Sequence, residues 1–354
     1  MTQEVFRKDV LAWGKLYNLI TGAVGMNDRT NILEQPIKLS SYSRCRLPVI
    51  SSTNITYDEC LDERAHELFQ LSKTLNKPLG IMWSGGIDST CVLVSFLRNF
   101  SLDELKGQIK IITSVEATFE NPEFYKKYIL PNFEIINGEN IPWLFDKSML
   151  LVSGEFNDQL FGSDLIRIYL TNKGKDEING PFNKDQVFNY INGKVDDPRV
   201  STILIDSIID SSKLVGVNLE KNNDFFWWYN FCFKWQAVHF RLYALIFPKF
   251  FDSVSEEFDR TYVHHFFQTD NFQLWSINNP QVRYITDWKN YKQLAKDSIY
   301  AFDKNEKYFI NKIKRPSLQT VFYHRPVIKA VTDEFKVLEE YNLQDFYNPK
   351  NMFR

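Results

Sequence analysis

The chain has 354 residues, of which 44% are hydrophobic and 24% are charged; its 42 basic and 44 acidic side chains leave a formal net charge of −2. This composition is typical of a globular protein and excludes a disordered or low-complexity chain. The near-neutral charge argues against nucleic acid as a partner, because polyanion binding needs a basic surface. No apolar run approaches the length that spans a bilayer, which argues against a membrane anchor.

The four cysteines are far apart in the sequence and form no C-x-x-C pair. Scattered thiols of this kind are typical of a reduced protein without a zinc site. The N-terminal segment mixes acidic and basic residues and has no sustained apolar core, so it does not have the pattern of a signal peptide. We therefore expect a cytoplasmic location.

The first half of the sequence has the pattern of an α/β fold. Residues 1–57 are predicted to be an N-terminal extension, and in residues 58–164 short apolar runs alternate with helical ones. Four runs have the β-branched content and the flanking Gly, Pro or Asn of buried strands, namely 78–83, 108–116, 132–138 and 148–154. Strands that alternate with helices predict a parallel twisted sheet with helices on both faces.

Residues 165–354 show no comparable series of strands and are predicted to be mainly α-helical. The aromatic run 224–247 and the amphipathic run 327–342 support this prediction, the second with apolar residues three and four apart. Between 171 and 199 the chain is polar and contains several Gly and Asn, which predicts a surface excursion or a lid.

The segment "IMWSGGIDST" contains the most specific motif. The strand is predicted to end at Trp83, residues 84–86 to form a tight turn, and the apolar run 91–97 to form the buried helix that follows. A glycine turn at a helix N-terminus favours phosphate, yet Asp88 should repel it. Because no G-x-x-x-x-G-K-[ST] motif supplies a lysine, we infer that Mg²⁺ links Asp88 to the phosphates.

The turn S-G-G-x-D-S resembles the signature loop of the N-type ATP pyrophosphatases, which cleave ATP between the α and β phosphates. The matching positions are Ser84, Gly85, Gly86, Asp88 and Ser89. The resemblance implies the sheet of that superfamily, also called HUP-like, with ATP and Mg²⁺ as cofactors. Ser114, at the end of the next predicted strand, is assigned to the same nucleotide site.

The segment "LLVSGEFNDQLFG" (150–162) resembles the S-G-E-x-x-D-E-L-F-G-G motif of the synthetase domain of asparagine synthetase and of its relative β-lactam synthetase. Here again a strand is predicted to end at a glycine turn, which assigns Ser153 and Gly154 to the nucleotide site. Asp158 lies one helical turn beyond Glu155 and would complete the Mg²⁺ site that Asp88 begins. The resemblance implies that Glu155 is catalytic and orients either the partner of the substrate carboxylate or the attacking amine.

Two weaker similarities follow in the order that the family has. Segments 266–280 and 287–302 are similar to later helices of the family, and "KIKRPSL" (312–318) makes Lys314 the counterpart of the family's catalytic lysine, with Lys312 as the alternative. The chain departs from the family pattern at Phe156, where a small residue is common, at Gln159 in place of Glu, and at 163–164 in place of Gly-Tyr. A bulkier and less acidic pocket wall argues against aspartate as the substrate.

The resemblance implies an ATP-dependent, amide-bond-forming ligase. Such an enzyme adenylates a small carboxylate with release of pyrophosphate, and ammonia or an amine then displaces AMP. Glutamine-using relatives have a glutaminase domain with a cysteine at position 2, where this chain has Thr2, so we expect ammonia, an amine substrate or a separate glutaminase as the nitrogen source.

Two other functions were weighed against the ligase. One is an ATP pyrophosphatase that modifies a nucleobase or tRNA, which the near-neutral charge and unpaired cysteines disfavour. The other is an inactive nucleotide-binding or scaffold protein, which the presence of both Asp88 and Asp158 disfavours. The sequence leaves open the acceptor, the amine donor and whether the chain forms a homo-oligomer.

Overall fold

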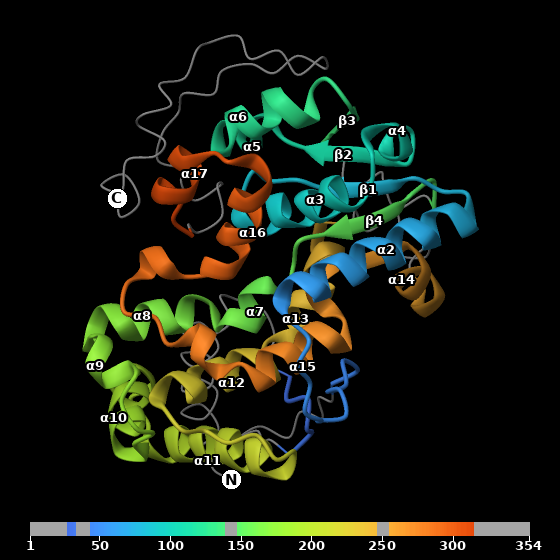
Figure 1. Ribbon diagram of the computed structural model, residues 1–354. Helices are drawn as coiled ribbons and strands as arrows, with labels where there is room; N and C mark the ends of the chain where they lie inside the picture. The colour runs from blue at the N-terminus through green and yellow to red at the C-terminus, as the bar shows by residue number, and fades with distance from the viewer. Residues whose placement is uncertain (1–26, 33–42, 139–146, 246–254, 315–354) are drawn as a thin grey trace. The chain divides into compact units, whose positions relative to one another are not determined.

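The computed structural model describes residues 27–32, 43–138, 147–245 and 255–314. They belong to two compact units, each assembled from separate stretches of the chain (Figure 1). The sheet unit comprises residues 55–155, 245–269 and 288–354, and the helical unit comprises residues 1–54, 156–244 and 270–287. The predicted helix at 327–342 lies outside the described residues.

The described elements of the sheet unit are five strands and a set of mostly short helices. They are α2 (Tyr57–Leu75), β1 (Leu79–Met82), α3 (Ile87–Asn99), α4 (Leu102–Leu105), β2 (Ile109–Thr113), α5 (Val115–Glu120), α6 (Pro122–Phe124), η1 (Tyr125–Ile129), β3 (Glu134–Asn137), β4 (Leu150–Ser153), α14 (Glu256–Tyr262), β5 (Val263–His265), η5 (Phe266–Gln268), η7 (Trp288–Asn290), α16 (Gln293–Asp303) and α17 (Glu306–Asn311).

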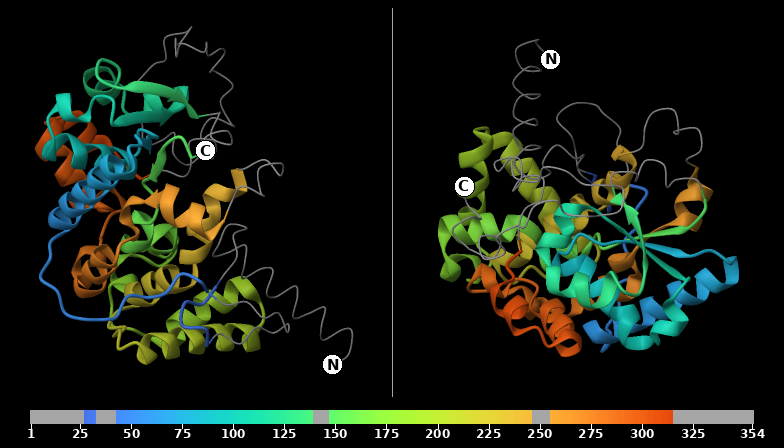
Figure 2. Two further views of the ribbon diagram at one scale, coloured as in Figure 1. Left: turned by 90° about the vertical axis from the view of Figure 1, so that its right-hand side faces the viewer. Right: turned by 90° about the horizontal axis from the view of Figure 1, so that it is seen from above.

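The sheet has the strand order β3-β2-β1-β4-β5, and every pair is parallel. The four predicted strands are confirmed, and the strands fan out in the right-hand view of Figure 2 as a twisted parallel sheet does. The fifth strand was not predicted. It is only three residues long and holds two histidines, and it extends the sheet by pairing with β4.

The order of the strands reverses between β1 and β4, because β2 and β3 lie to one side of β1 and β4 and β5 lie to the other. In open α/β sheets ligands bind outside the carboxyl ends of the strands at such a reversal. β1 ends at Met82 and β4 ends at Ser153, directly before the two glycine motifs. The topology therefore brings both motifs to the position where a ligand is expected.

Local sequence explains how the helices of the sheet unit begin. Thr56 and Glu59 form a capping box at the start of α2, which packs along α3. α3 begins after Gly86, and no side chain of the described residues caps its N-terminus. The first amides of α3 therefore face the glycine turn without a capping oxygen, as in anion-binding helices.

The helical unit is mainly α-helical, as predicted. Its described elements are α7 (Asn157–Phe161), α8 (Ser163–Lys173), α9 (Lys175–Ile178), α10 (Lys184–Val195), α11 (Pro198–Leu214), α12 (Asn222–Phe233), α13 (Trp235–Phe240), η3 (Arg241–Leu245, whose last residue belongs to the sheet unit), α15 (Asp270–Asn278) and η6 (Pro280–Arg283).

The core of the helical unit is aromatic. Every residue of α12 is buried, because this helix is apolar on all its faces and is surrounded by other helices. The polar segment 171–199 is largely helical: Asn183 and Asp197 cap α10 and α11 with their side chains. Its role as a lid stays a prediction. Within the described ranges, no helix has the length and apolar content needed to cross a membrane.

Candidate active site

The first glycine turn joins β1 to α3 in a conformation that depends on glycine. Gly85 has a φ of +71°, and a Cβ atom there would lie 2.4 Å from the carbonyl oxygen of Ala117. The turn is tied to the first turn of α3, because the backbone N–H of Ser84 donates to Oγ of Ser89 at 3.0 Å and the two hydroxyls are 3.0 Å apart. The matched residues 84–89 thus form one hydrogen-bonded loop.

The second glycine turn lies directly against the first. A Cβ at Gly154 would lie 3.0 Å from the backbone nitrogen of Ser89, so only glycine allows this approach. Oγ of Ser153 is 2.7 Å from Nδ1 of the buried His265 and accepts a hydrogen bond from the backbone N–H of Glu155 at 3.3 Å. The structure therefore places the turn of Ser153, Gly154 and Glu155 beside the first motif, and their roles at a nucleotide site stay a prediction.

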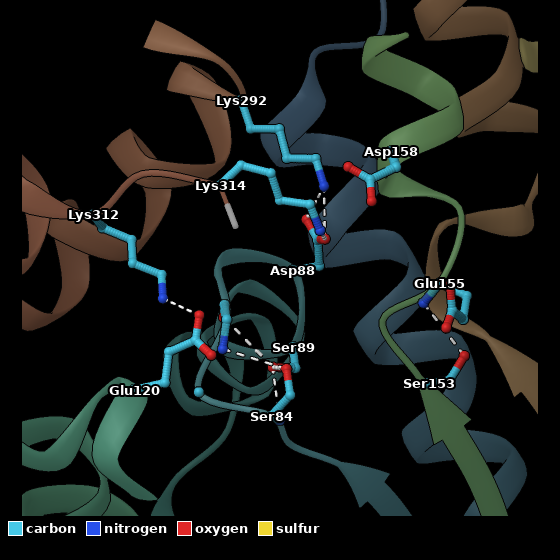
Figure 3. Close-up of polar contacts among 12 residues, drawn as sticks. Ser84, Asp88, Ser89, Glu120, Ser153, Glu155, Asp158, Lys292, Lys312 and Lys314 are labelled. Carbon is cyan, nitrogen blue, oxygen red and sulfur yellow. Dashed lines mark hydrogen bonds and ion pairs between the residues drawn. The ribbon is translucent and has the colours of Figure 1, made fainter. Parts of the chain in front are cut away.

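Lys292 contacts both carboxylate oxygens of Asp88 in the glycine loop. Its ammonium group lies 2.7 and 2.6 Å from the two carboxylate oxygens of Asp88 (Figure 3). The side chain of Lys292 is fully buried, whereas 17% of the Asp88 side chain is exposed. The ammonium group of Lys292 is therefore buried and paired with a carboxylate, which holds it in one place beside the glycine turn.

Two more lysines come from the extended chain after α17. The ammonium of Lys314 lies 3.7 Å from Oδ2 of Asp88, and that of Lys312 forms a buried ion pair with Glu120 (Figure 3). The indole N–H of Trp288 donates to the carbonyl oxygen of Lys314 at 3.0 Å. Of the two lysines that the sequence left as alternatives, Lys314 is the one beside Asp88.

The sequence analysis inferred Mg²⁺ at Asp88 because no motif places a lysine within the loop. Lys292 and Lys314 reach Asp88 from more than 200 residues further along the chain, so positive charge is present beside the loop without a metal. The described residues contain no group of three Asp, Glu, His or Cys side chains that could hold a metal ion. Both carboxylate oxygens of Asp88 are hydrogen-bonded to Lys292, and Mg²⁺ binding at Asp88 stays a prediction.

The remaining predicted residues occupy other positions. Ser114 lies at the end of β2, where its hydroxyl accepts from the backbone N–H of Ala117 and caps α5. Asp158 belongs to the helical unit, in the first turn of α7, and its role as a metal ligand stays a prediction. Phe156 and Ser163, two departures from the family pattern, have φ values of +79° and +63°, so both keep a backbone conformation that glycine adopts most easily.

Sequence reasoning missed Lys292, Glu120 and His265. Lys292 precedes α16 in a left-handed conformation, and a lysine beside a helix start looks like an ordinary surface residue. Glu120 ends α5 in a segment that matches no motif, and His265 belongs to the three-residue strand β5, which the sequence did not predict. The one available signal was the similarity of segment 287–302 to a family helix, which includes Lys292 without singling it out.

Two cysteines of the sheet unit lack the low pKa of a reactive thiol. Burial raises the pKa of the Cys60 and Cys91 thiols to about 12, so both stay protonated near neutral pH. A thiolate nucleophile or sulfur carrier is therefore not found at either position.

No protein-family model matches this sequence, and no curated protein is significantly similar to it. The assignment of function therefore depends on the residues of the site and their geometry.

Proposed function

We propose that the protein is an ATP-dependent carbon–nitrogen ligase that forms AMP and pyrophosphate. The observation that carries this proposal is the S-G-G-x-D-S turn at the end of β1, packed against the S-G-E turn at the end of β4 and supplied with two lysines at Asp88. The turn and α3 offer backbone amides to phosphate, and the lysines offer charge.

The pyrophosphate end of ATP would lie at residues 84–89, because that turn combines uncapped amides of α3 with the ammonium groups of Lys292 and Lys314. Asp88 would hold Mg²⁺ together with the phosphate oxygens, and the ion would neutralise charge on the departing pyrophosphate. In this arrangement Asp88 keeps Lys292 in place before the nucleotide arrives, and the charge of Asp88 is already compensated.

The reaction has two transfers. A carboxylate oxygen of the substrate attacks the α-phosphorus, the bond from that phosphorus to the bridging oxygen breaks, and pyrophosphate leaves with both electrons. The nitrogen of ammonia or an amine then attacks the acyl carbon, the acyl–oxygen bond breaks and AMP leaves. The nitrogen gives up a proton, and the half-buried carboxylate of Glu155 is the base that we assign to it. Lys314 would stabilise charge on the α-phosphate and acyl oxygens.

A screen for ATP–pyrophosphate exchange tests this proposal. Amino acids and other small carboxylic acids are supplied one at a time with MgATP and labelled pyrophosphate, and at least one should support exchange. With an amine present, AMP and pyrophosphate should accumulate in equal amounts. ADP and orthophosphate as the primary products would contradict the proposal, because the loop was assigned to the leaving pyrophosphate.

Asp88→Asn supplies the matched variant for this screen. It should abolish Mg²⁺-dependent ATP binding while the protein stays folded, since it removes a metal ligand from a loop held by Ser84 and Ser89. Asp103→Asn is the control, because Asp103 has a 96% exposed side chain in α4 of the same unit. Unchanged Mg²⁺ dependence in Asp88→Asn would remove this residue from the metal site.

A further inference from the structure

The ion pair between Lys312 and Glu120 is more deeply buried than binding to solvent-accessible phosphate requires. The side chains of Lys312 and Glu120 are 4% and 8% exposed. Removing two charges from water is costly, so a buried pair is weak evidence for stability and calls for another explanation.

Glu120 borders the first glycine turn. A Cβ atom at Gly85 would lie 2.8 Å from Cβ of Glu120, and one at Gly86 would lie 3.8 Å from Oε1 of the same side chain. The hydroxyl of Tyr308, which is buried in α17, donates to the carbonyl oxygen of Gly85 at 3.5 Å. The turn therefore lies between Glu120, at the end of α5, and Tyr308 of α17.

Lys312 and Lys314 point to the same side because the chain leaves α17 in an extended conformation. Lys312 has φ and ψ values of −71° and 115°, and in extended backbone the side chains of residues two apart point the same way. The intervening Ile313 is buried. Figure 3 shows Lys312 reaching Glu120 and Lys314 reaching Asp88.

We propose that Lys312 and Glu120 are positioning residues, whose ion pair fixes the 312–314 segment against the glycine turn and so aims Lys314 at the reacting phosphate. The contact of Lys314 with Asp88 is 3.7 Å long and its side chain is 24% exposed, so that contact alone does not fix its place. The consequence for catalysis rests on the proposed function, but the positioning itself does not.

The first test needs no ligand. The variant carrying both Glu120→Gln and Lys312→Met removes both buried charges at once, which avoids an uncompensated charge that could unfold the protein. In limited acetylation with mass-spectrometric readout, the rate at Lys314 should rise at least roughly threefold in this variant, because the segment then keeps the Trp288 hydrogen bond and the buried Ile313 but loses its ion pair.

Lys292 is the internal control for that measurement. It comes from the start of α16 and is held by Asp88 directly, so its acetylation rate should change less than about twofold. A rate at Lys314 that stays unchanged would overturn the proposal. An equal rise at Lys292 and Lys314 would also overturn it, since that result means general loosening of the unit. Lys307→Met, an exposed position in α17, provides the matched single substitution and should leave both rates unchanged.

The second test asks whether the pair acts through Lys314. With an acid that supports exchange, the double variant should lower the exchange rate by roughly 10- to 100-fold, as expected when a catalytic group is misplaced by about 1 Å. In a Lys314→Met background the same two substitutions should lower it less than about threefold further, because the group they position is absent.

An equal loss in both backgrounds would show that the pair does not act through Lys314. If no acid supports exchange in the unsubstituted protein, the proposed function fails, and the acetylation rates still decide whether Lys312 and Glu120 position Lys314.

Discussion

The two units each contain an ion pair with a fully buried cation, and the surroundings of the two pairs differ. In the helical unit Arg283 and Asp224 lie 3.1 Å apart, and both side chains are 2% exposed. The hydroxyl of Tyr284 donates to Asp224, and Arg283 also donates to the carbonyl oxygen of Ser276 and lies over the ring of Trp227. In the sheet unit Lys292 is equally buried, but its partner Asp88 borders a glycine turn and is partly exposed.

We expect this difference to separate a structural pair from a pair that serves the proposed function. The charges of Arg283 and Asp224 have protein partners, from which we infer that the pair stabilises one arrangement of the aromatic core. Lys292 and Asp88 face the position where the topology predicts a ligand, and a phosphate could replace the carboxylate as the partner of the lysine. Substitutions in the two pairs should therefore change different measured quantities.

The largest expected effect belongs to the structural pair. Arg283→Met should lower the free energy of unfolding by about 3–5 kcal/mol, because it leaves the Asp224 carboxylate buried without its cation. Urea unfolding followed by tryptophan fluorescence measures this change. Adding Asp224→Asn to the same chain should recover part of the loss, since the uncompensated charge is then gone. A loss below about 1 kcal/mol in the single variant would show that the pair contributes little to the fold.

Substitution of Lys314, the second lysine beside Asp88, should instead change the rate of the proposed reaction. Lys314→Met should keep the affinity for ATP within a few-fold and lower the rate of the chemical step by about 10²–10³-fold, the range for one preorganised electrostatic donor. The negative charge on the reacting oxygens is greatest in the transition state, so the ammonium group of Lys314 contributes little to binding of ATP in the ground state. Single-turnover rates and ATP titrations separate the two quantities, with Lys307→Met in α17 as the control. A rate change below about threefold would identify Lys314 as an ordinary surface charge.

Lys292→Met should have a smaller effect that appears in binding. Loss of a charge-assisted hydrogen bond to phosphate costs about 1.5–3 kcal/mol, so the dissociation constant of Mg-pyrophosphate should rise roughly 10- to 100-fold. Its free energy of unfolding should fall less than that of Arg283→Met, because Asp88 still reaches water and Lys314. Calorimetric titration and urea unfolding test these statements together. Unchanged affinity with a large loss of stability would place Lys292 beside Arg283 as a structural residue.

The comparison also explains which parts of the molecule could be predicted from sequence. The strands β1 to β4 and both glycine turns are local patterns, and their meeting follows from parallel topology. Lys292 and Glu120 have no local pattern: each acquires its place only when α16 and α5 pack against the loop that begins at Ser84. The metal was inferred because the charge that balances Asp88 comes from a distant part of the chain. The strand β5 was missed for a similar reason, since three residues are too few to show a period.

His264 is a third ionisable group of the sheet unit, in which burial outweighs the hydrogen bond to Thr261 and the acidic neighbours that raise its pKa. Burial in β5, and then the charge of Arg64, lower the pKa of His264 to about 4, while Nε2 lies 3.1 Å from the carbonyl oxygen of Thr261. Glu67 and Asp259 act in the opposite direction and do not offset the burial. The folded protein therefore holds this imidazole neutral at pH values where the unfolded chain protonates it.

Protonation of His264 makes the free energy of unfolding depend on pH. Because the folded pKa of about 4 is below the ordinary value near 6.5, the unfolded chain binds more protons between these two values. The contribution of the neutral His264 to the free energy of unfolding is complete above about pH 6.5 and is lost as the pH falls toward 4. The loss is roughly 1–3 kcal/mol for this half-buried group.

Urea unfolding at pH 4.5 and 7.5 measures this loss, and the difference in the free energy of unfolding between the two pH values should be smaller in His264→Gln than in the unsubstituted protein. His66→Gln, at an exposed position of α2, should leave the difference unchanged. If His264→Gln keeps the full difference, other groups cause the loss of stability in acid, and the ion pairs become the next candidates.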